Sequence, residues 1–195
     1  MRLIICLGNP GRKYAGTPHN LGFEIADLLS QRAGLVFKSS LKYTSCIAKG
    51  TLAGCETILL KPATFMNRSG DAVFRFLRYH PVPPSDILVI TDDINLPLGR
   101  LRFRERGSHG GHKGLLSIIQ TLNTGEFPRL RIGIKSQEEV EDYIKYVLTP
   151  FRGEERERIA RMKILAADAV EYYLSNGLSK AASHYNRQTP LEQDI

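Results

Sequence analysis

One histidine and one aspartate stand where they could form a catalytic pair. His19 lies just before a helical pattern, and Asp92 follows the apolar run DILVIT at residues 86–91. An imidazole beside a carboxylate can act as a general base, because the carboxylate holds the tautomer of the ring and raises its basicity. Taken alone, His19 could equally be a residue that packs or caps at the entry of a helix.

Two asparagines follow other apolar runs of the same kind. Asn9 comes after the run RLIICL, and Asn67 comes shortly after ETILLKP, close to Phe65. Each asparagine by itself is compatible with a turn or a helix cap. In a parallel sheet, however, active sites gather beyond the carboxyl ends of the strands. We therefore expect Asn9, Asn67 and Asp92 to meet at one edge of a sheet.

The sequence lacks the motifs of several competing chemistries. Gly-x-Ser-x-Gly does not occur, and each cysteine lies in or beside an apolar run, so we expect water to be the nucleophile. His109 and His112 stand three apart in the loop RGSHGGHKG, without H-E-x-x-H or a nearby cysteine, and we expect no metal. Neither this loop nor GNPGRKYAG matches a nucleotide-binding motif, so no cofactor is expected. The glycines do open backbone N–H groups toward an anion or a carbonyl.

A row of arginines occupies every second position of RLRFRER. They are Arg100, Arg102, Arg104 and Arg106. In a strand they would share one face, either as a solvated edge that resists aggregation or as a phosphate-binding stripe, since a guanidinium binds phosphate oxygens two at a time. Arg129 and Arg131 add positive charge on a neighbouring element.

Composition narrows the class of partner. The 195 residues include 27 Lys and Arg against 20 Asp and Glu, giving a net charge of +7, so a nucleic acid is a plausible partner. Three cysteines form no C-x-x-C pair, which fits a reducing compartment. The apolar opening LIICL is too short for a signal-peptide core or a membrane span. We expect a cytoplasmic protein that does not bind a membrane.

Strand-like apolar runs alternate with helical patterns along the chain. The expected strands are 2–7, 46–54, 56–62, 86–91, 100–105 and 129–134, and the expected helices are 20–34, 70–80, 114–123, 139–148 and about 154–177. This order predicts an α/β fold with a mostly parallel sheet covered on both faces, and a turn at 53–54 predicts an antiparallel hairpin within it. We expect one domain at 1–186 and a C-terminal tail at 187–195.

Five segments together resemble one family, the bacterial-type peptidyl-tRNA hydrolases. They are LGNPGRKYAGTPHNLGF, LLKPATFMNRSG, DDINLPLGRLRFR, GSHGGHKG and FPRLRIGI, in this order and over nearly the whole chain. The resemblance implies a single α/β domain around a twisted mixed sheet, usually monomeric. It also implies hydrolysis of the ester between a peptide and the 3′ end of tRNA, without a metal or cofactor.

The resemblance assigns roles to particular residues. It implies that His19 is the catalytic histidine, that Asp92 is its carboxylate partner, and that Asn9 and Asn67 hold substrate. The positions expected to grip the 5′-phosphate of the acceptor stem are Arg104 and Arg131. Further substrate contacts are expected from Tyr14, Phe65 and Lys113.

Lys113 departs from the pattern of the family. The usual motif reads G-G-H-N-G, whereas this chain has GGHKG. A lysine offers three donors and no acceptor, so it cannot reproduce the two-way contact of an amide, although it could contact phosphate or an oxyanion. Three outcomes are open: an active enzyme with altered peptide contacts, a weakened enzyme, or a relative that binds RNA without cutting it. A generic α/β esterase is disfavoured by the missing nucleophile and the basic charge.

Overall fold

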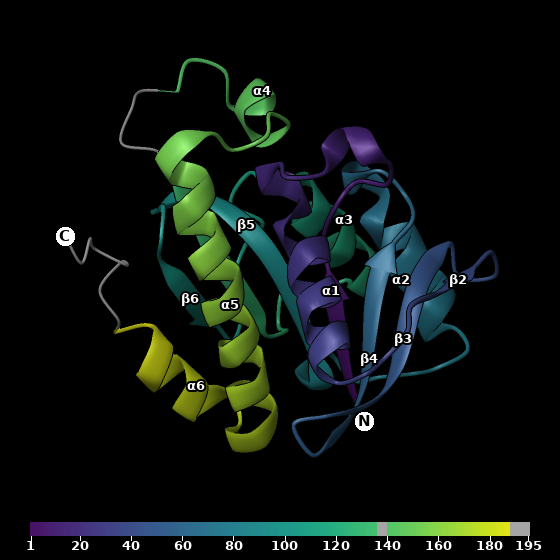
Figure 1. Ribbon diagram of the computed structural model, residues 1–195. Coiled ribbons are helices and arrows are strands. Elements are labelled where there is room, and N and C mark those ends of the chain that lie inside the picture. The colour runs from purple at the N-terminus through teal and green to yellow at the C-terminus, as the bar shows by residue number, and fades with distance from the viewer. Residues whose placement is uncertain (136–139, 188–195) are drawn as a thin grey trace.

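The computed structural model describes residues 1–135 and 140–187, and one mixed sheet is at its centre (Figure 1). Its strand order is β2-β3-β4-β1-β5-β7-β6. The strands are β1 (Arg2–Cys6), β2 (Lys38–Ser40), β3 (Ser45–Leu52), β4 (Cys55–Pro62), β5 (Ile87–Pro97), β6 (Leu101–Arg104) and β7 (Arg129–Lys135). The central strands β4, β1, β5 and β7 are parallel, and antiparallel strands flank them at both edges. The predicted α/β fold with a mixed, mostly parallel core is confirmed.

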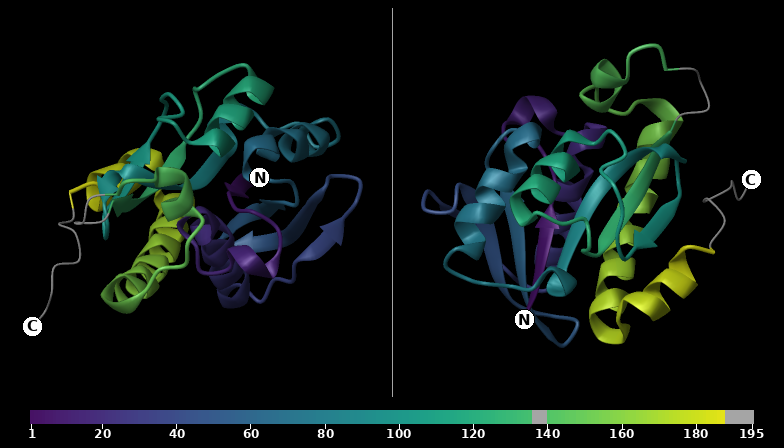
Figure 2. Two further views of the ribbon diagram at one scale, coloured as in Figure 1. Left: turned by 90° about the horizontal axis from the view of Figure 1, so that it is seen from above. Right: turned by 180° about the vertical axis from the view of Figure 1, so that it is seen from behind.

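Helices cover both faces of this sheet (Figure 2). Helices α1 (Leu21–Arg32), α5 (Gly153–Asn176) and α6 (Leu178–Tyr185) pack on one face, and α2 (Ser69–Leu77) and α3 (Lys113–Leu122) pack on the other. Alternate residues of β1 serve the two cores: Ile4 faces α1 and α5, whereas Leu3 and Ile5 face α2 and α3. All three side chains are fully buried, as expected for a central parallel strand.

Four short 3-10 helices and one short α-helix of the described residues lie in the connections between the longer elements. The 3-10 helices are η1 (Arg12–Tyr14), η2 (Pro18–Asn20), η3 (Met66–Arg68) and η4 (Pro84–Asp86). Helix α4 (Tyr143–Val147) lies beyond the carboxyl ends of the central strands, at the top of Figure 1. The site described below is built at this end.

Several boundaries differ from the expectation. The helix expected at 139–148 begins only at Tyr143, because the side chain of Asp142 caps it by accepting from the N–H groups of Ile144 and Lys145 at 2.9 and 3.0 Å. Strand β2 and helix α6 were not expected. The row of four arginines is also only partly a strand, since β6 contains Arg102 and Arg104 alone. Residues 136–139 and nearly all of the expected tail at 187–195 lie outside the described residues.

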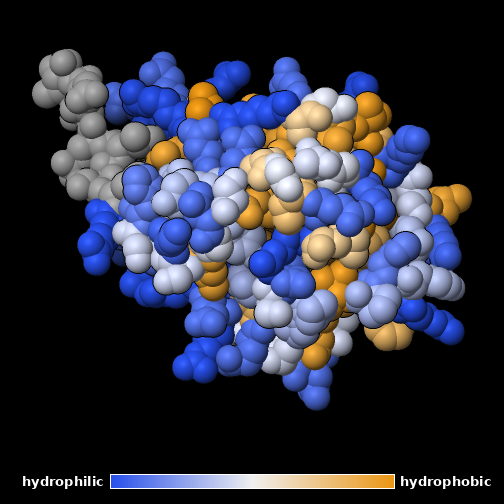
Figure 3. Space-filling model, turned by 90° about the horizontal axis from the view of Figure 1, so that it is seen from below, coloured by the Kyte–Doolittle hydropathy of each residue, from blue (hydrophilic) through white to orange (hydrophobic). Residues whose placement is uncertain are grey.

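Hydrophilic side chains cover most of the face seen in Figure 3, and hydrophobic ones show between them in small groups. Within the described residues, no helix combines the length and the apolar composition needed to cross a bilayer.

Helix α1 approaches the sheet backbone closely at Gly22. A Cβ built there would collide with the carbonyl oxygen of Leu7, and would lie 2.5 Å from the Leu7 nitrogen and 3.0 Å from the Ile90 oxygen. These neighbours are backbone atoms, at the end of β1 and within β5, and they cannot rotate away as a side chain could. The absence of a side chain at Gly22 therefore sets how close η2, which carries His19, lies to the end of β1 and the middle of β5.

Gly22→Ala tests this close packing. Alanine normally stabilises a helix interior relative to glycine by about 0.5–1 kcal/mol. Here we expect the opposite sign, because overpacking against backbone typically costs about 1–3 kcal/mol. Urea unfolding of the variant should show a lower free energy of unfolding, and activity should fall with the displacement of His19. A stabilised, fully active variant would contradict the close approach.

Candidate active site

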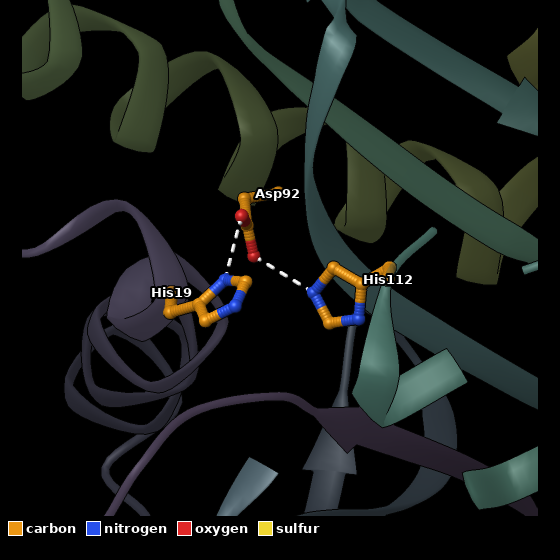
Figure 4. A group of neighbouring side chains, drawn as sticks. All are labelled: His19, Asp92 and His112. Atoms are coloured by element: carbon orange, nitrogen blue, oxygen red, sulfur yellow. Dashed lines mark hydrogen bonds and ion pairs between the residues drawn. The ribbon is translucent and has the colours of Figure 1, made fainter. Parts of the chain in front are cut away.

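Asp92 lies between two histidines in the middle of β5, just past the point where the pairing of β5 with β1 ends (Figure 4). Its Oδ2 atom is 2.9 Å from Nδ1 of His19, and its Oδ1 atom is 3.0 Å from Nε2 of His112. The two imidazole rings are 4.9 Å apart between centroids. His19 comes from η2 on one side of the sheet, and His112 immediately precedes α3 on the other. The fold therefore brings together the pair that the sequence predicted, and adds a second histidine to it.

The carboxylate of Asp92 is buried, with 4% of the residue exposed. Burial raises the pKa of Asp92, but the facing charges and hydrogen bonds of the two histidines outweigh burial and hold its pKa well below the usual range. Asp92 is therefore ionised and accepts hydrogen bonds at both oxygens.

The backbone of α3 fixes the tautomer of His112. Nδ1 of this ring accepts hydrogen bonds from the N–H groups of Gly114 at 3.1 Å and Leu115 at 3.2 Å. An accepting nitrogen carries a lone pair, so the proton of neutral His112 must be on Nε2, which donates to Asp92. His112 thus caps a helix with one nitrogen and holds the carboxylate with the other.

The same reasoning leaves one lone pair on His19. Because ionised Asp92 can only accept, Nδ1 of His19 carries the proton of that bond. The lone pair of the neutral ring is then on Nε2. His19 keeps 15% of its side chain exposed and lines the cavity described below, so it is suited to accept a proton from water.

These three residues also have the types and spacing of a metal site. One ligand atom from each of His19, Asp92 and His112 falls within 4.8 Å of the others. The hydrogen bonds argue against that use, because a metal at Nε2 of His112 would place the ring proton on Nδ1, facing two N–H donors. The donor set therefore fits proton transfer better than metal binding.

Asn9 presents a fixed amide beside this centre. Its Oδ1 atom accepts from the N–H of Met66 at 2.8 Å, which turns the NH2 group away from Met66. Asn20 holds the backbone of Asn9 from both sides, since Oδ1 of Asn20 accepts from its N–H at 2.8 Å and Nδ2 donates to its carbonyl at 3.1 Å. Asn20 is a positioning residue that the sequence reasoning missed.

A cavity of about 630 Å³ contains every residue expected to bind or react. These are Asn9, Tyr14, His19, Phe65, Asn67, Asp92, Arg104, Lys113 and Arg131. The first and the last of them, Asn9 and Arg131, are 122 positions apart in the sequence. The meeting of Asn9, Asn67 and Asp92 was expected from the sheet, and the fold brings the other six residues to the same cavity.

The arginines of this cavity divide into two kinds. The side chain of Arg131 is 24% exposed, and its guanidinium forms an ion pair with Asp93. Burial lowers the pKa of Arg104, and the positive charges of nearby Arg102 and Arg131 lower it further. Arg129 is 1% exposed instead, and donates to the carbonyls of Gly107, Ser108 and Gly125, so it anchors the base of the glycine loop.

A model of the family described as peptidyl-tRNA hydrolase matches residues 3–193. The chain belongs to the peptidyl-tRNA hydrolase family. The peptidyl-tRNA hydrolase of Thermoanaerobacter sp. (strain X514) is 44% identical over 186 residues, covering 95% of this chain and 100% of that protein. The enzyme of Chloroflexus aggregans is 45% identical over 187 residues, covering 95% and 99%. The crystal structure of peptidyl-tRNA hydrolase from Acinetobacter baumannii matches with a TM-score of 0.90 at 32% identity, covering 97% of this chain and 96% of that one.

Membership of the peptidyl-tRNA hydrolase family makes the chain a hydrolase that acts on the ester bond of peptidyl-tRNA. The non-catalytic RNA-binding alternative is not favoured, since these relatives are hydrolases and the His19–Asp92 pair is intact.

One wall of the cavity was missed from the sequence. Helix α4 and its C-cap contribute Tyr143, Ile144, Val147 and Leu148. Tyr143 and Ile144 are 57% and 64% exposed, which is unusual for large apolar side chains. The pattern at 139–148 predicted a helix, but an apolar helix face does not by itself show whether it packs on a core or borders an open cavity.

Asp92→Asn probes the buried charge through its pH dependence. The amide cannot accept at both positions, so one histidine N–H loses its acceptor, at a cost of about 1–3 kcal/mol. Because folding depresses the pKa of Asp92, its stabilising contribution is fully present above the unfolded-state pKa of about 3.9 and is lost as the pH falls toward the folded-state pKa. Urea unfolding from pH 7 to pH 2 should show the gap between wild type and variant closing below about pH 4. A gap that stays constant to pH 2 would contradict an ionised Asp92.

Proposed function

We propose that His19 is the general base that activates water for ester hydrolysis. The observation that carries the proposal is the bond from Nδ1 of His19 to buried Asp92, which leaves Nε2 with its lone pair at the cavity. Nε2 takes one proton from water as the water oxygen bonds to the ester carbonyl. The imidazolium that forms is stabilised by the Asp92 charge, and the same proton passes to the 3′ oxygen of tRNA as the ester bond breaks.

The amide of Asn9 is suited to stabilise the charge that develops on the carbonyl oxygen. Its NH2 group is the half of the amide that Met66 leaves free, and Asn9 lines the cavity. A donor held in place before the reaction needs no reorganisation when charge develops, which makes such contacts effective. Asn67, an exposed amide that also lines the cavity, is proposed to hold the substrate backbone.

Apolar and aromatic groups are proposed to receive the peptide. Tyr14 and Phe65 line the cavity, and Phe65 is 56% exposed. Together with the apolar wall of α4 they offer contact area that discriminates little between side chains. This suits a substrate whose peptide varies.

Arg104 and Arg131 are proposed to bind a phosphate of tRNA, the 5′-phosphate of the acceptor stem. Both line the same cavity as His19, and the strand register pairs Arg131 with Arg102 and Arg129 with Arg104, which puts all four on one face. Guanidinium groups bind phosphate oxygens in pairs. A cluster of positive charges that nearby carboxylates do not neutralise favours the binding of an anionic ligand.

We further propose that the protein acts as a monomer in the cytoplasm. The monomer is supported by the cavity, because a single copy supplies every residue expected to bind or react. The compartment is supported by Cys6, Cys46 and Cys55, all free thiols.

His19→Ala tests the proposed base. Removing a general base typically costs about 10²–10⁴-fold in rate. We expect kcat for release of a labelled N-blocked aminoacyl group from tRNA to fall by that amount. Affinity for tRNA should change little, because the arginines that hold phosphate remain.

His80→Ala is the matched control. His80 does not line the cavity. Its Nε2 atom is 2.9 Å from the hydroxyl of Tyr43, which lies between β2 and β3, at the edge of the sheet opposite β6. It should release the aminoacyl group as the wild type does. A His19→Ala variant as active as this control would end the proposal.

Lys113→Asn tests the residue that departs from the family motif. Lys113 is exposed, lines the cavity beside His112, and forms no hydrogen bond or ion pair within residues 1–135 and 140–187. We expect its ammonium to contact phosphate, so the variant should have a higher KM and a salt dependence of binding shallower by about one unit of slope. A loss confined to kcat would instead assign Lys113 to the reacting oxyanion.

A further inference from the structure

Asp93 forms an ion pair with the arginine that is proposed to bind phosphate. Nε of Arg131 donates to Oδ2 of Asp93, and the Asp93 side chain is only 9% exposed. Oδ1 of Asp93 is also engaged, because it accepts from the N–H of Asn95 at 2.8 Å. The carboxylate is thus held at both oxygens, and it holds the guanidinium at one edge.

The strand register explains why these two side chains meet. Arg131 of β7 pairs with Thr91 of β5, and Asp93 lies two residues further along β5, on the same face of the sheet as Thr91. Asp92, between them, points to the other face and meets His19. Two consecutive aspartates of one strand therefore serve two different partners.

We propose that Asp93 is a positioning residue that aims Arg131 at the phosphate of tRNA. The carboxylate takes Nε, which leaves the two terminal amino groups of the guanidinium as the edge offered to an anion. Arg102 is paired with Arg131 across β6 and β7, and Arg104 lies near it, so their charges repel Arg131. Within residues 1–135 and 140–187, the ion pair with Asp93 is the contact that holds the Arg131 guanidinium in one orientation. The inference rests on the proposed phosphate-binding role of Arg131.

A competing effect of Asp93 would have the opposite sign. A carboxylate beside an arginine can also repel an incoming phosphate and weaken its binding. The shielded position of Asp93 favours the positioning role, since Asp93 is less exposed than Arg131 and its oxygens are already satisfied by Asn95 and Nε. The two effects are separable by the direction in which a neutral variant moves.

Asp93→Asn is the sharpest substitution for this test. The N–H of Asn95 still requires an acceptor, so the new amide keeps its oxygen there and turns its NH2 group toward Nε of Arg131. Two donors then face each other, and Arg131 must leave its orientation. Asp93→Glu keeps the charge on a longer arm and should recover part of the loss.

The measurement compares kcat and KM for N-blocked aminoacyl-tRNA with a 5′-phosphate and with a 5′-hydroxyl. We expect the wild type to prefer the phosphorylated substrate through KM, and Arg131→Ala to lose that preference. In Asp93→Asn the preference for the 5′-phosphate should be about tenfold smaller than in the wild type, again through KM, as expected for the loss of one charged hydrogen bond. Asp93→Asn combined with Arg131→Ala should be no worse than Arg131→Ala alone.

Asp86→Asn supplies the control for the change in net charge. Asp86 also forms an ion pair with an arginine, Arg2, but neither residue lines the cavity. It should keep the wild-type preference. A preference in Asp93→Asn that equals or exceeds that of the wild type would overturn the positioning role. A preference that survives Arg131→Ala would instead overturn the phosphate role of Arg131, and the inference with it.

Discussion

The buried negative charge of Asp92 is the constraint around which the site is organised. A carboxylate with so little exposure is stable only if donors satisfy both of its oxygens. One donor comes from η2, next to α1, and the other from the N-cap of α3, so elements on opposite faces of the sheet converge on one residue of β5. The close approach of Gly22 to the backbone of Leu7 and Ile90 meets the same requirement, because it lets η2 reach Asp92. The catalytic geometry is in this sense a consequence of satisfying one buried charge.

Strand β5 also sets the distance between His19 and Arg131, because it carries the aspartates that contact them. Asp92 and Asp93 are consecutive, and the alternation of a strand sends their side chains to opposite faces. One fixes the tautomer of His19, and the other contacts Arg131. A rigid, centrally placed strand keeps the base and the arginine cluster at a constant separation. A constant separation suits a substrate such as peptidyl-tRNA, which carries its ester and its phosphates on one molecule.

The order of elements was predictable from the sequence because strands buried on both faces and amphipathic helices leave different periodicities. The meeting of Asn9, Asn67 and Asp92 was predictable because the carboxyl ends of parallel strands share one edge. The role of His112 was not predictable, since HGGH suggests either a flexible loop or a weak metal pattern until the N–H groups of α3 are seen to occupy Nδ1. The Asp93–Arg131 pair was missed for a related reason. It depends on the register of β5 against β7, and a single sequence does not specify register.

The charges that line the cavity suit an anionic substrate. The cavity is lined by Arg104, Arg106, Arg129, Arg131 and Lys113 against two carboxylates. Both carboxylates are shielded by their own partners, Asp92 by the histidines and Asp93 by Arg131, so neither presents an unpaired charge to an incoming polyanion. The excess of positive charge therefore faces the cavity without a carboxylate to neutralise it, which suits a polyanionic substrate such as peptidyl-tRNA.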